Sequence, residues 1–145
     1  MIFISHRGNL NGKNKKLENT PKYIIEAIKK GYHVEVDIWF DKCFYLGHDF
    51  PQYKISKKFL LNKKLWCHAK NLDALYELHK IKAKYFWHQN DDYTLTSNNY
   101  IWTYPGKTLS KKSICVLPEI KKTKIPKFIS GICSDYIEKY KKKFS

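Results

Sequence analysis

Apolar and polar positions alternate along the chain with two different periods. Apolar runs at residues 2–6 and 32–40 predict the first two strands. Between them, Thr20 and Pro21 are typical of the start of a helix, apolar residues then recur at helical spacing, and Gly31 marks the end. Because strand and helix patterns follow each other in this way, the sequence predicts an α/β fold.

The same pattern continues along the rest of the chain, but the helices become fewer. Residues 65–70 predict a third main strand, and Asn71 is typical of the cap of a second clear helix. Shorter strands are expected at residues 43–46, 85–88, 100–104, 114–117 and 128–133, and shorter helices at residues 56–62 and 135–143.

The number of elements decides between a complete and a reduced barrel. A complete (β/α)8 barrel usually takes ~250 residues, whereas this chain has 145 and supplies seven or eight strands but only three or four helices. We therefore expect one domain over residues 1–145, folded as a compact, trimmed (β/α) TIM-like barrel with missing or shortened later helices. Aromatic side chains or a homodimer interface could cover the flank that these helices leave open.

Composition adds a strong positive charge to this picture. The formal net charge is +15, and lysine supplies most of it. Such a surface favours polyanions or an anionic membrane surface as partners, although biased base composition in the source genome explains the lysines equally well. We do not expect a nucleic-acid-binding protein, because the chain has no zinc finger, basic heptad or RRM-type aromatic motif.

Signals for membranes and secretion are not evident in the sequence. No apolar run approaches the roughly 18 residues of a membrane span, and the first residues lack the basic and apolar regions of a secretory signal. We therefore expect a cytoplasmic protein. The four cysteines lie far apart without a CxxC pair, so buried free thiols are a better interpretation than a disulfide or a zinc cluster.

Two carboxylates in the second predicted strand are the first candidates for chemistry. Glu35 and Asp37 are two residues apart, so a strand places both on one face, while Val34 and Val36 take the other. Neighbouring carboxylates repel each other and suit a hard divalent cation with oxygen ligands. The alternative is an edge strand with a solvated polar face, which the apolar flanking segments disfavour.

Histidines follow two other predicted strands. His6 offers an acid or base near neutral pH, and Arg7 beside it offers a fork for a phosphate group. His48 follows the strand at residues 43–46, and Asp49 could orient its ring. Two histidines on opposite sides of a phosphate would divide the work, because one activates the nucleophile and the other protonates the leaving oxygen. Taken alone, each histidine is equally well explained as a structural residue or part of a polar turn.

These residues occur in an order that resembles a known family. Within the first 50 residues the chain contains, in sequence, His6-Arg7-Gly8, Glu18-Asn19-Thr20, Ala27, Gly31, Glu35-x-Asp37 and His48-Asp49. This order resembles the glycerophosphodiester phosphodiesterase family, in the larger phosphatidylinositol phospholipase C-like group. Later in the chain, Lys70 and the stretch Gly131-Ile132-Cys133-Ser134-Asp135 resemble the same family more faintly.

The resemblance implies a barrel enzyme that uses one divalent metal ion to hydrolyse small phosphodiesters, such as glycerophosphodiesters or related phospholipid-derived compounds. Carried onto this chain, it assigns the metal to Glu35 and Asp37, acid and base catalysis to His6 and His48, phosphate binding to Arg7 and Lys70, and supporting roles to Glu18, Asn19 and Asp49. In the family, a substrate hydroxyl can attack phosphorus first and give a cyclic phosphate, which water then opens.

The chain departs from the family pattern at the third metal ligand. The family has a carboxylate two residues before the lysine, whereas this chain has His68 before Lys70. A neutral histidine can bind a divalent ion but weakens the case for Ca²⁺, so we expect Mg²⁺ or Mn²⁺, with Ca²⁺ or Zn²⁺ as alternatives. His68 could instead contact phosphate, and Glu119 is an alternative ligand.

Two other functions stay open as alternatives. The short chain and the changed third ligand would fit a non-catalytic basic barrel that binds nucleic acid or anionic lipid. A phospholipase D-like lyase of the same group would share the metal and the two histidines, although the Arg7-Gly8 pair argues against it. The combination of two histidines with a carboxylate pair favours the phosphodiesterase, because a pure binding protein needs neither.

Overall fold

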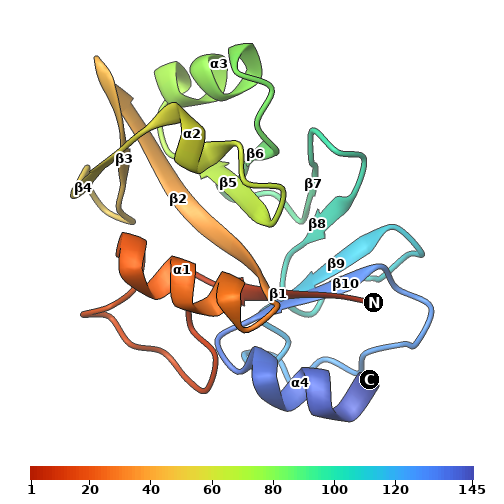
Figure 1. Cartoon of the computed structure of the whole chain (residues 1–145). Helices are drawn as coiled ribbons and strands as arrows, with labels where there is room; N and C mark the ends of the chain where they lie inside the picture. Colours follow the sequence, from red (N-terminus) through yellow and green to blue (C-terminus); the bar gives the residue numbers. More distant parts are fainter.

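A ten-stranded, mostly parallel sheet and four helices form a mixed α/β fold in the computed structural model, which describes residues 1–145 (Figure 1). The strands are β1 (Ile2–His6), β2 (His33–Asp41), β3 (Cys43–Leu46), β4 (Tyr53–Ile55), β5 (Leu65–Ala69), β6 (Tyr85–Trp87), β7 (Tyr93–Leu95), β8 (Ile101–Thr103), β9 (Ser113–Val116) and β10 (Gly131–Ser134). The helices are α1 (Pro21–Lys29), α2 (Lys57–Leu60), α3 (Leu72–Lys80) and α4 (Ile137–Phe144). None of these helices is long and apolar enough to cross a membrane.

Parallel pairing joins seven of the strands in the order β6–β5–β2–β1–β10–β9–β8. β3 pairs antiparallel with the second half of β2 and carries β4, while β7 pairs antiparallel with β8. No strand pairing joins β6 directly to β8; between them, the Ser97 amide donates a hydrogen bond to the Tyr85 carbonyl oxygen at 2.9 Å. The sheet is therefore continuous, but strand pairing does not close it.

The two faces of the sheet bury two separate apolar cores. On one face, Val34 and Val36 of β2 belong to a core of 20 buried residues, to which α1 and α3 contribute. The other face carries a smaller core of seven buried residues, which includes Ile4 and Trp66. Because side chains alternate along a strand, the polar residues of β2 stand on the face of the smaller core, at the carboxyl end of an otherwise apolar layer.

Local capping positions α3 against the end of β2. The Asn71 Oδ1 atom accepts hydrogen bonds from the backbone amides of Ala74 and Phe40, each at 3.1 Å, and its Nδ2 atom donates to the Phe40 carbonyl oxygen at 2.8 Å. The first of these bonds caps α3, and the other two hold the backbone of β2. One amide thus fixes the helix relative to the strand, directly after Lys70.

The structure differs from the sequence analysis in the number of strands. The prediction of seven or eight strands is too low, because β4 and β7 are missing from it. Both strands are three residues long and none of their residues is buried, so they carry no clear apolar alternation. The helices predicted at residues 56–62 and 135–143 are present but begin and end differently, as α2 and α4. All four cysteines are free thiols, as predicted, but only Cys67, Cys115 and Cys133 are buried; Cys43 is half-buried.

Candidate active site

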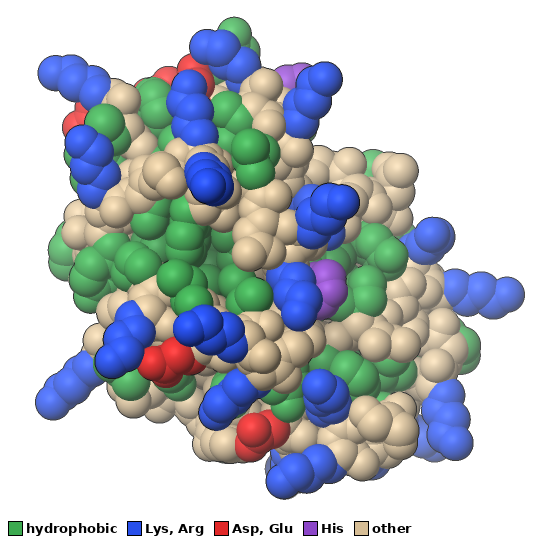
Figure 2. Space-filling view, in the orientation of Figure 1, with side chains coloured by type: hydrophobic (Ala, Val, Ile, Leu, Met, Phe, Trp, Pro, Cys, Tyr) green, Lys and Arg blue, Asp and Glu red, His purple; other side chains and the backbone are tan.

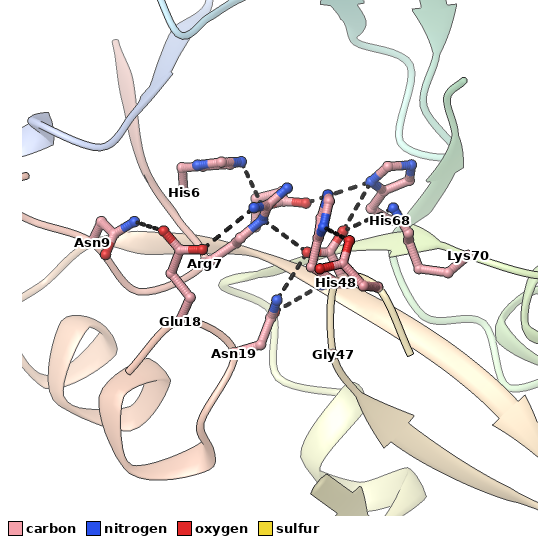
Figure 3. A network of polar contacts seen from close by, with 12 residues as sticks. His6, Arg7, Asn9, Glu18, Asn19, Gly47, His48, His68 and Lys70 are labelled. Atoms are coloured by element: carbon pink, nitrogen blue, oxygen red, sulfur yellow. Dashed lines mark hydrogen bonds and ion pairs between the residues drawn. The ribbon is translucent and has the colours of Figure 1, made fainter. Parts of the chain in front are cut away.

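Three neighbouring parallel strands bring the candidate residues together at their carboxyl ends (Figure 3). In the pairing of β1 with β2, His6 lies opposite Glu35, and in the pairing of β2 with β5, Asp37 lies opposite His68. Parallel strands end at the same edge of a sheet, so these side chains share one site. The fold therefore assembles residues that are more than 60 positions apart in the sequence.

Glu35, Asp37 and His68 form a group that could hold a metal ion. One ligand atom from each residue lies within 4.8 Å of the others. Both carboxylates are buried, with exposed fractions of 2% for Glu35 and 0% for Asp37. The Glu35 Oε2 and Asp37 Oδ1 atoms have no hydrogen-bond partner. Buried carboxylate oxygens without partners are costly, and a bound cation would satisfy them, so these residues fit a divalent metal.

The hydrogen bonding of His68 supports the same conclusion. Its Nε2 atom lies 2.8 Å from the carbonyl oxygen of His88, which can only accept, so Nε2 carries the proton. The Nδ1 atom then faces Asp37 Oδ1 at 3.2 Å and Glu35 Oε1 at 3.8 Å. In a neutral ring this nitrogen presents a lone pair to two carboxylates, which is unfavourable unless a cation lies between them. A carbonyl behind the ring is also the usual second contact of a metal-binding histidine.

Asn19 holds Asp37 through both atoms of its amide. The Asn19 Nδ2 atom donates to Asp37 Oδ2 at 2.8 Å, and the Asp37 amide donates to Asn19 Oδ1 at 3.0 Å. Arg7 Nε lies 2.9 Å from the same Oδ2 atom. Burial alone would raise the pKa of Asp37, but a protonated His68, with Nδ1 at 3.2 Å, and the charge of Arg7 outweigh burial and hold this pKa well below its usual range. Asp37 is therefore ionised and fixed in place.

The carboxyl of Glu35 behaves differently from that of Asp37. Burial is the main effect on Glu35, and together with the neighbouring negative charge of Asp37 it raises the pKa of this carboxyl, against the opposing effect of His6 and Arg7. The pKa of one buried carboxyl is thus raised while that of its neighbour is lowered. This difference indicates that the two carboxylates have too little positive charge between them for both to be ionised. This is the environment that a divalent cation would relieve.

A strained turn after β1 aims Arg7 at the carboxylates. Arg7 and Asn19 both have left-handed backbone conformations, with φ of 54° and 60°. Two backbone hydrogen bonds hold them there, from the Arg7 amide to the Glu35 carbonyl oxygen at 2.9 Å and from the Asn19 amide to the Arg7 carbonyl oxygen at 3.1 Å. Gly8 follows with φ of 95°, where an added Cβ would clash with the Tyr23 ring. Gly8 is thus required by the turn itself.

Asp135 is a partner of His6 to which sequence analysis gives no role in the site. The His6 Nδ1 atom lies 2.7 Å from Asp135 Oδ1, which also accepts from Asn9 Nδ2 at 2.8 Å. Burial opposes the protonation of His6, but its hydrogen bond to Asp135 and the charge of Glu35 outweigh burial and raise its pKa. The other ring nitrogen, Nε2, lies 3.8 Å from Glu35 Oε2. His6 is thus held by one carboxylate and faces another.

His48 has the same arrangement on a different segment. Its Nδ1 atom lies 2.7 Å from Asp49 Oδ1, and its side chain is 42% exposed. Gly47 allows the chain to turn here, because its φ is 152° and an added Cβ would overlap the Phe50 carbonyl oxygen. The Gly47 backbone is fixed to β2, since Trp39 Nε1 donates to its carbonyl oxygen at 2.7 Å. The turn after β3 therefore presents His48 to the site.

One cavity of about 490 Å³ connects the two histidines. Its polar wall is formed by His6, Arg7, Glu35, His48, His68 and Lys70. The lining also contains aromatic residues, with Trp87, Trp102 and Tyr104. A cavity of this size accepts a small ligand, and the charged groups gathered on one side would fix its orientation.

The charges around the cavity do not balance while the histidines are neutral. Four carboxylates belong to one network there. Those of Glu35 and Asp135 contact His6, and those of Glu18 and Asp37 contact Arg7. Only Arg7 and Lys70 offset them, with Lys70 Nζ at 3.6 Å from Asp37 Oδ1. When all four carboxylates are ionised and the histidines are neutral, two negative charges remain, which one divalent cation would compensate.

Of the remaining predicted site residues, Glu18 belongs to the polar network around the carboxylates, and Glu119 does not belong to the metal group. The Glu18 carboxylate contacts Arg7 Nη1 at 3.4 Å and accepts from Asn9 Nδ2 at 2.9 Å. Glu119 is outside the metal group, so the structure gives no support to it as an alternative ligand. Its carboxylate instead accepts from the Ser134 hydroxyl at 3.0 Å and the Asp135 amide at 3.1 Å.

Replacing Asn19 with glycine should weaken metal binding without disrupting the turn. Glycine tolerates the positive φ of this position, so Asn19→Gly removes only the amide that holds Asp37. We expect Mn²⁺ affinity, measured by titration calorimetry, to fall about 10- to 100-fold, because contacts behind a metal ligand typically have effects of this size. As a control, Asn62→Gly removes an amide far from the carboxylates and should leave affinity unchanged. Unaltered affinity in Asn19→Gly would contradict the assignment of Asp37 as a ligand.

Comparison with known proteins gives no relative from which these roles could be transferred: no protein-family model, no curated protein and no solved structure matches the chain.

Proposed function

We propose that this protein is a metal-dependent phosphodiester hydrolase of the glycerophosphodiester phosphodiesterase type. The observation that carries the proposal is a pair of histidines on separate segments that line one cavity together with Glu35 and His68, two of the three residues that could hold a metal ion. Each histidine has a carboxylate at Nδ1, from Asp135 for His6 and from Asp49 for His48. This constellation is suited to transferring two protons in one displacement reaction.

A divalent ion would be held by Glu35, Asp37 and His68, and Mg²⁺ or Mn²⁺ suits a set of two carboxylates and one imidazole. When bound, it would stabilise the negative charge that develops on the phosphoryl oxygens. Arg7 and Lys70 line the same cavity and supply positive charge for the phosphate from the protein itself.

Proton transfer would use the Nε2 atoms of the two histidines. In each ring, Nδ1 donates to its aspartate, which leaves Nε2 to exchange a proton with the substrate. One histidine takes the proton of the attacking oxygen as the new P–O bond forms; this oxygen belongs to a neighbouring hydroxyl in a glycerophosphodiester and to water in a substrate without such a hydroxyl. The other gives a proton to the leaving alcohol oxygen as the old P–O bond breaks. Each histidine ends in the opposite protonation state. The opening of a cyclic phosphate by water through the same groups, or proton exchange with solvent after direct attack by water, restores both.

The fold that we propose for this activity is the trimmed barrel. The seven parallel strands follow one another in a barrel-like order, and the antiparallel strand β7 lies in the interval between β6 and β8. In barrels of this kind, catalytic groups stand at the carboxyl ends of the strands. The positions of His6 at the end of β1 and of His68 near the end of β5 agree with that pattern.

A substrate panel tests the proposed reaction. We expect the Mn²⁺-loaded protein to hydrolyse the diesters bis(p-nitrophenyl) phosphate and glycerophosphocholine. The monoester p-nitrophenyl phosphate should stay nearly unhydrolysed, because the two histidines are placed for a phosphate that carries two ester oxygens. Product release is followed by absorbance and by phosphorus NMR. Equal turnover of the monoester, or turnover of neither diester by the folded, metal-loaded protein, would contradict the proposal.

A further inference from the structure

A second cavity, remote from the two histidines, is dominated by lysines. It has a volume of about 550 Å³ and is lined by 11 residues of the segment after β9 and of α4. Five of them are lysines, namely Lys122, Lys124, Lys127, Lys139 and Lys143. We call these five residues and the space between them the lysine cavity. None of the five lines the cavity of the candidate active site.

The lysine content of this cavity exceeds the background of the chain. Lysine and arginine together account for 28 of 145 residues, or about a fifth, whereas lysine alone makes up 5 of the 11 lining residues. Figure 2 shows Lys and Arg side chains spread singly over the visible face of the molecule. Two smaller cavities, one beside His48 and one beside Tyr32, are lined by two lysines each. The lysine cavity therefore gathers more lysines than either of them.

The positive charges in the lysine cavity are not neutralised by the protein. None of the five lysines forms an ion pair; the lysines that do are Lys70, Lys80 and Lys107. Glu119 is the one acidic residue in the lining. Its carboxylate already accepts hydrogen bonds from the Ser134 hydroxyl and the Asp135 amide. The lysine cavity thus carries a concentrated, uncompensated positive charge.

The backbone holds these lysines together against their mutual repulsion. Lys139 and Lys143 are four residues apart on α4, a spacing at which like charges destabilise a helix. Lys122 has a left-handed backbone with φ of 47°, and the Thr123 amide next to it donates to the Pro118 carbonyl oxygen at 2.9 Å. Thr123 itself also lines the cavity. An anion with several oxygen acceptors in the site would relieve the repulsion between the lysines.

We propose that the lysine cavity binds a small, multiply phosphorylated anion, either free or as the head group of a membrane lipid. A concave site with five ammonium groups matches several phosphate groups better than one, because a single phosphate would leave most of the charge unpaired. The site is distinct from the phosphodiester cavity and does not depend on the proposed catalytic activity.

Calorimetric titration with tripolyphosphate tests the proposal directly. We expect the triple variant Lys124→Gln, Lys127→Gln and Lys143→Gln to bind tripolyphosphate at least about tenfold more weakly than the unaltered protein. The matched control Lys29→Gln, Lys30→Gln and Lys58→Gln loses the same charge elsewhere, and its affinity should change less than about threefold. Thermal denaturation verifies that both variants are folded. Equal weakening in the two variants, or no binding by the unaltered protein, would overturn the proposal.

Vesicle sedimentation distinguishes the two sources of the anion. Phosphatidylcholine vesicles that contain phosphatidylinositol bisphosphate are compared with vesicles of equal total charge that contain phosphatidylserine. Preference for the phosphoinositide vesicles that is lost in the cavity variant, but kept in the control variant, supports a lipid head group. Tripolyphosphate binding without such a preference supports a free anion. Equal sedimentation of the cavity and control variants with both vesicle types, together with equal tripolyphosphate affinities, would reject a specific site.

Discussion

Replacing His48 with alanine is expected to lower kcat for phosphodiester hydrolysis by about 10²- to 10⁴-fold, the usual contribution of a positioned acid or base. The side chain is 42% exposed and contacts Asp49, so its removal leaves no buried group without a partner. His48 is also outside the group that could hold the metal. Mn²⁺ affinity and the thermal denaturation midpoint should therefore stay unchanged while turnover is lost.

Two further variants separate a catalytic histidine from a structural one. Asp49→Asn keeps a partner at Nδ1 but removes its charge, so kcat should fall less than in His48→Ala. His79→Ala removes an exposed histidine on α3 that contacts the Tyr85 hydroxyl at 2.8 Å, and it should have no effect on turnover. Steady-state kinetics on glycerophosphocholine provide the comparison, because its alcohol leaving group needs a proton, whereas p-nitrophenolate leaves without one. Full activity in His48→Ala would show that the two-histidine mechanism is wrong.

Replacing Glu35 with glutamine is expected to lower Mn²⁺ affinity at least about 100-fold, and turnover should fall with it, because the change removes a metal ligand's charge and keeps its shape. The metal-free protein should tolerate this change. Burial, followed by the charge of Asp37, raises the pKa of Glu35, which means that its ionised form is disfavoured in the folded protein. A neutral amide removes that unfavourable charge, so loss of metal binding will be separable from unfolding.

A distant carboxylate provides the control for this substitution. Glu77 lies on α3, where it contacts Lys80 at 3.4 Å, and Glu77→Gln should leave both Mn²⁺ affinity and turnover unchanged. Calorimetry gives stoichiometry and affinity, and urea unfolding gives the free energy of the metal-free protein. If Glu35→Gln binds one Mn²⁺ as tightly as the unaltered protein, the ion is held elsewhere and the site described here is not the metal centre.

Local sequence signals account for most of the fold around the site. Thr20 and Pro21 predict the start of α1, and the Thr20 hydroxyl does accept from the Tyr23 amide, at 3.4 Å. Asn71 predicts the start of α3, which it caps. These signals lie within a few residues of the bonds that they predict, so a single sequence contains them. The short strands β4 and β7 lack such signals and depend on pairing with more distant strands.

The candidate site was predictable where it depends on strand periodicity. The two-residue spacing of Glu35 and Asp37, and that of His68 and Lys70, predicts that each pair shares a face, and the structure brings all four to one site. The role of Asp135 depends instead on the parallel pairing of β1 with β10, between segments about 130 residues apart. No local pattern indicates that pairing, so the contact between Asp135 and His6 appears only in the folded chain.

The hydrogen-bond direction of His68 is a second feature that sequence could not provide. It depends on the His88 carbonyl oxygen, 20 residues away on the segment after β6. That bond assigns the proton to Nε2 and leaves Nδ1 for the carboxylates or for a cation. The sequence offers a choice between metal binding and phosphate contact for His68, and this geometry favours metal binding.

Turnover after removal and return of the metal tests the central claim most directly. The protein is treated with a chelator, dialysed, and assayed on glycerophosphocholine before and after addition of Mg²⁺, Mn²⁺, Ca²⁺ or Zn²⁺. We predict no turnover in the chelated protein and restoration by Mn²⁺ or Mg²⁺ in the unaltered protein but not in His48→Ala. Turnover that persists in the chelated protein, or that no metal restores to a folded sample, would contradict a metal-dependent phosphodiesterase.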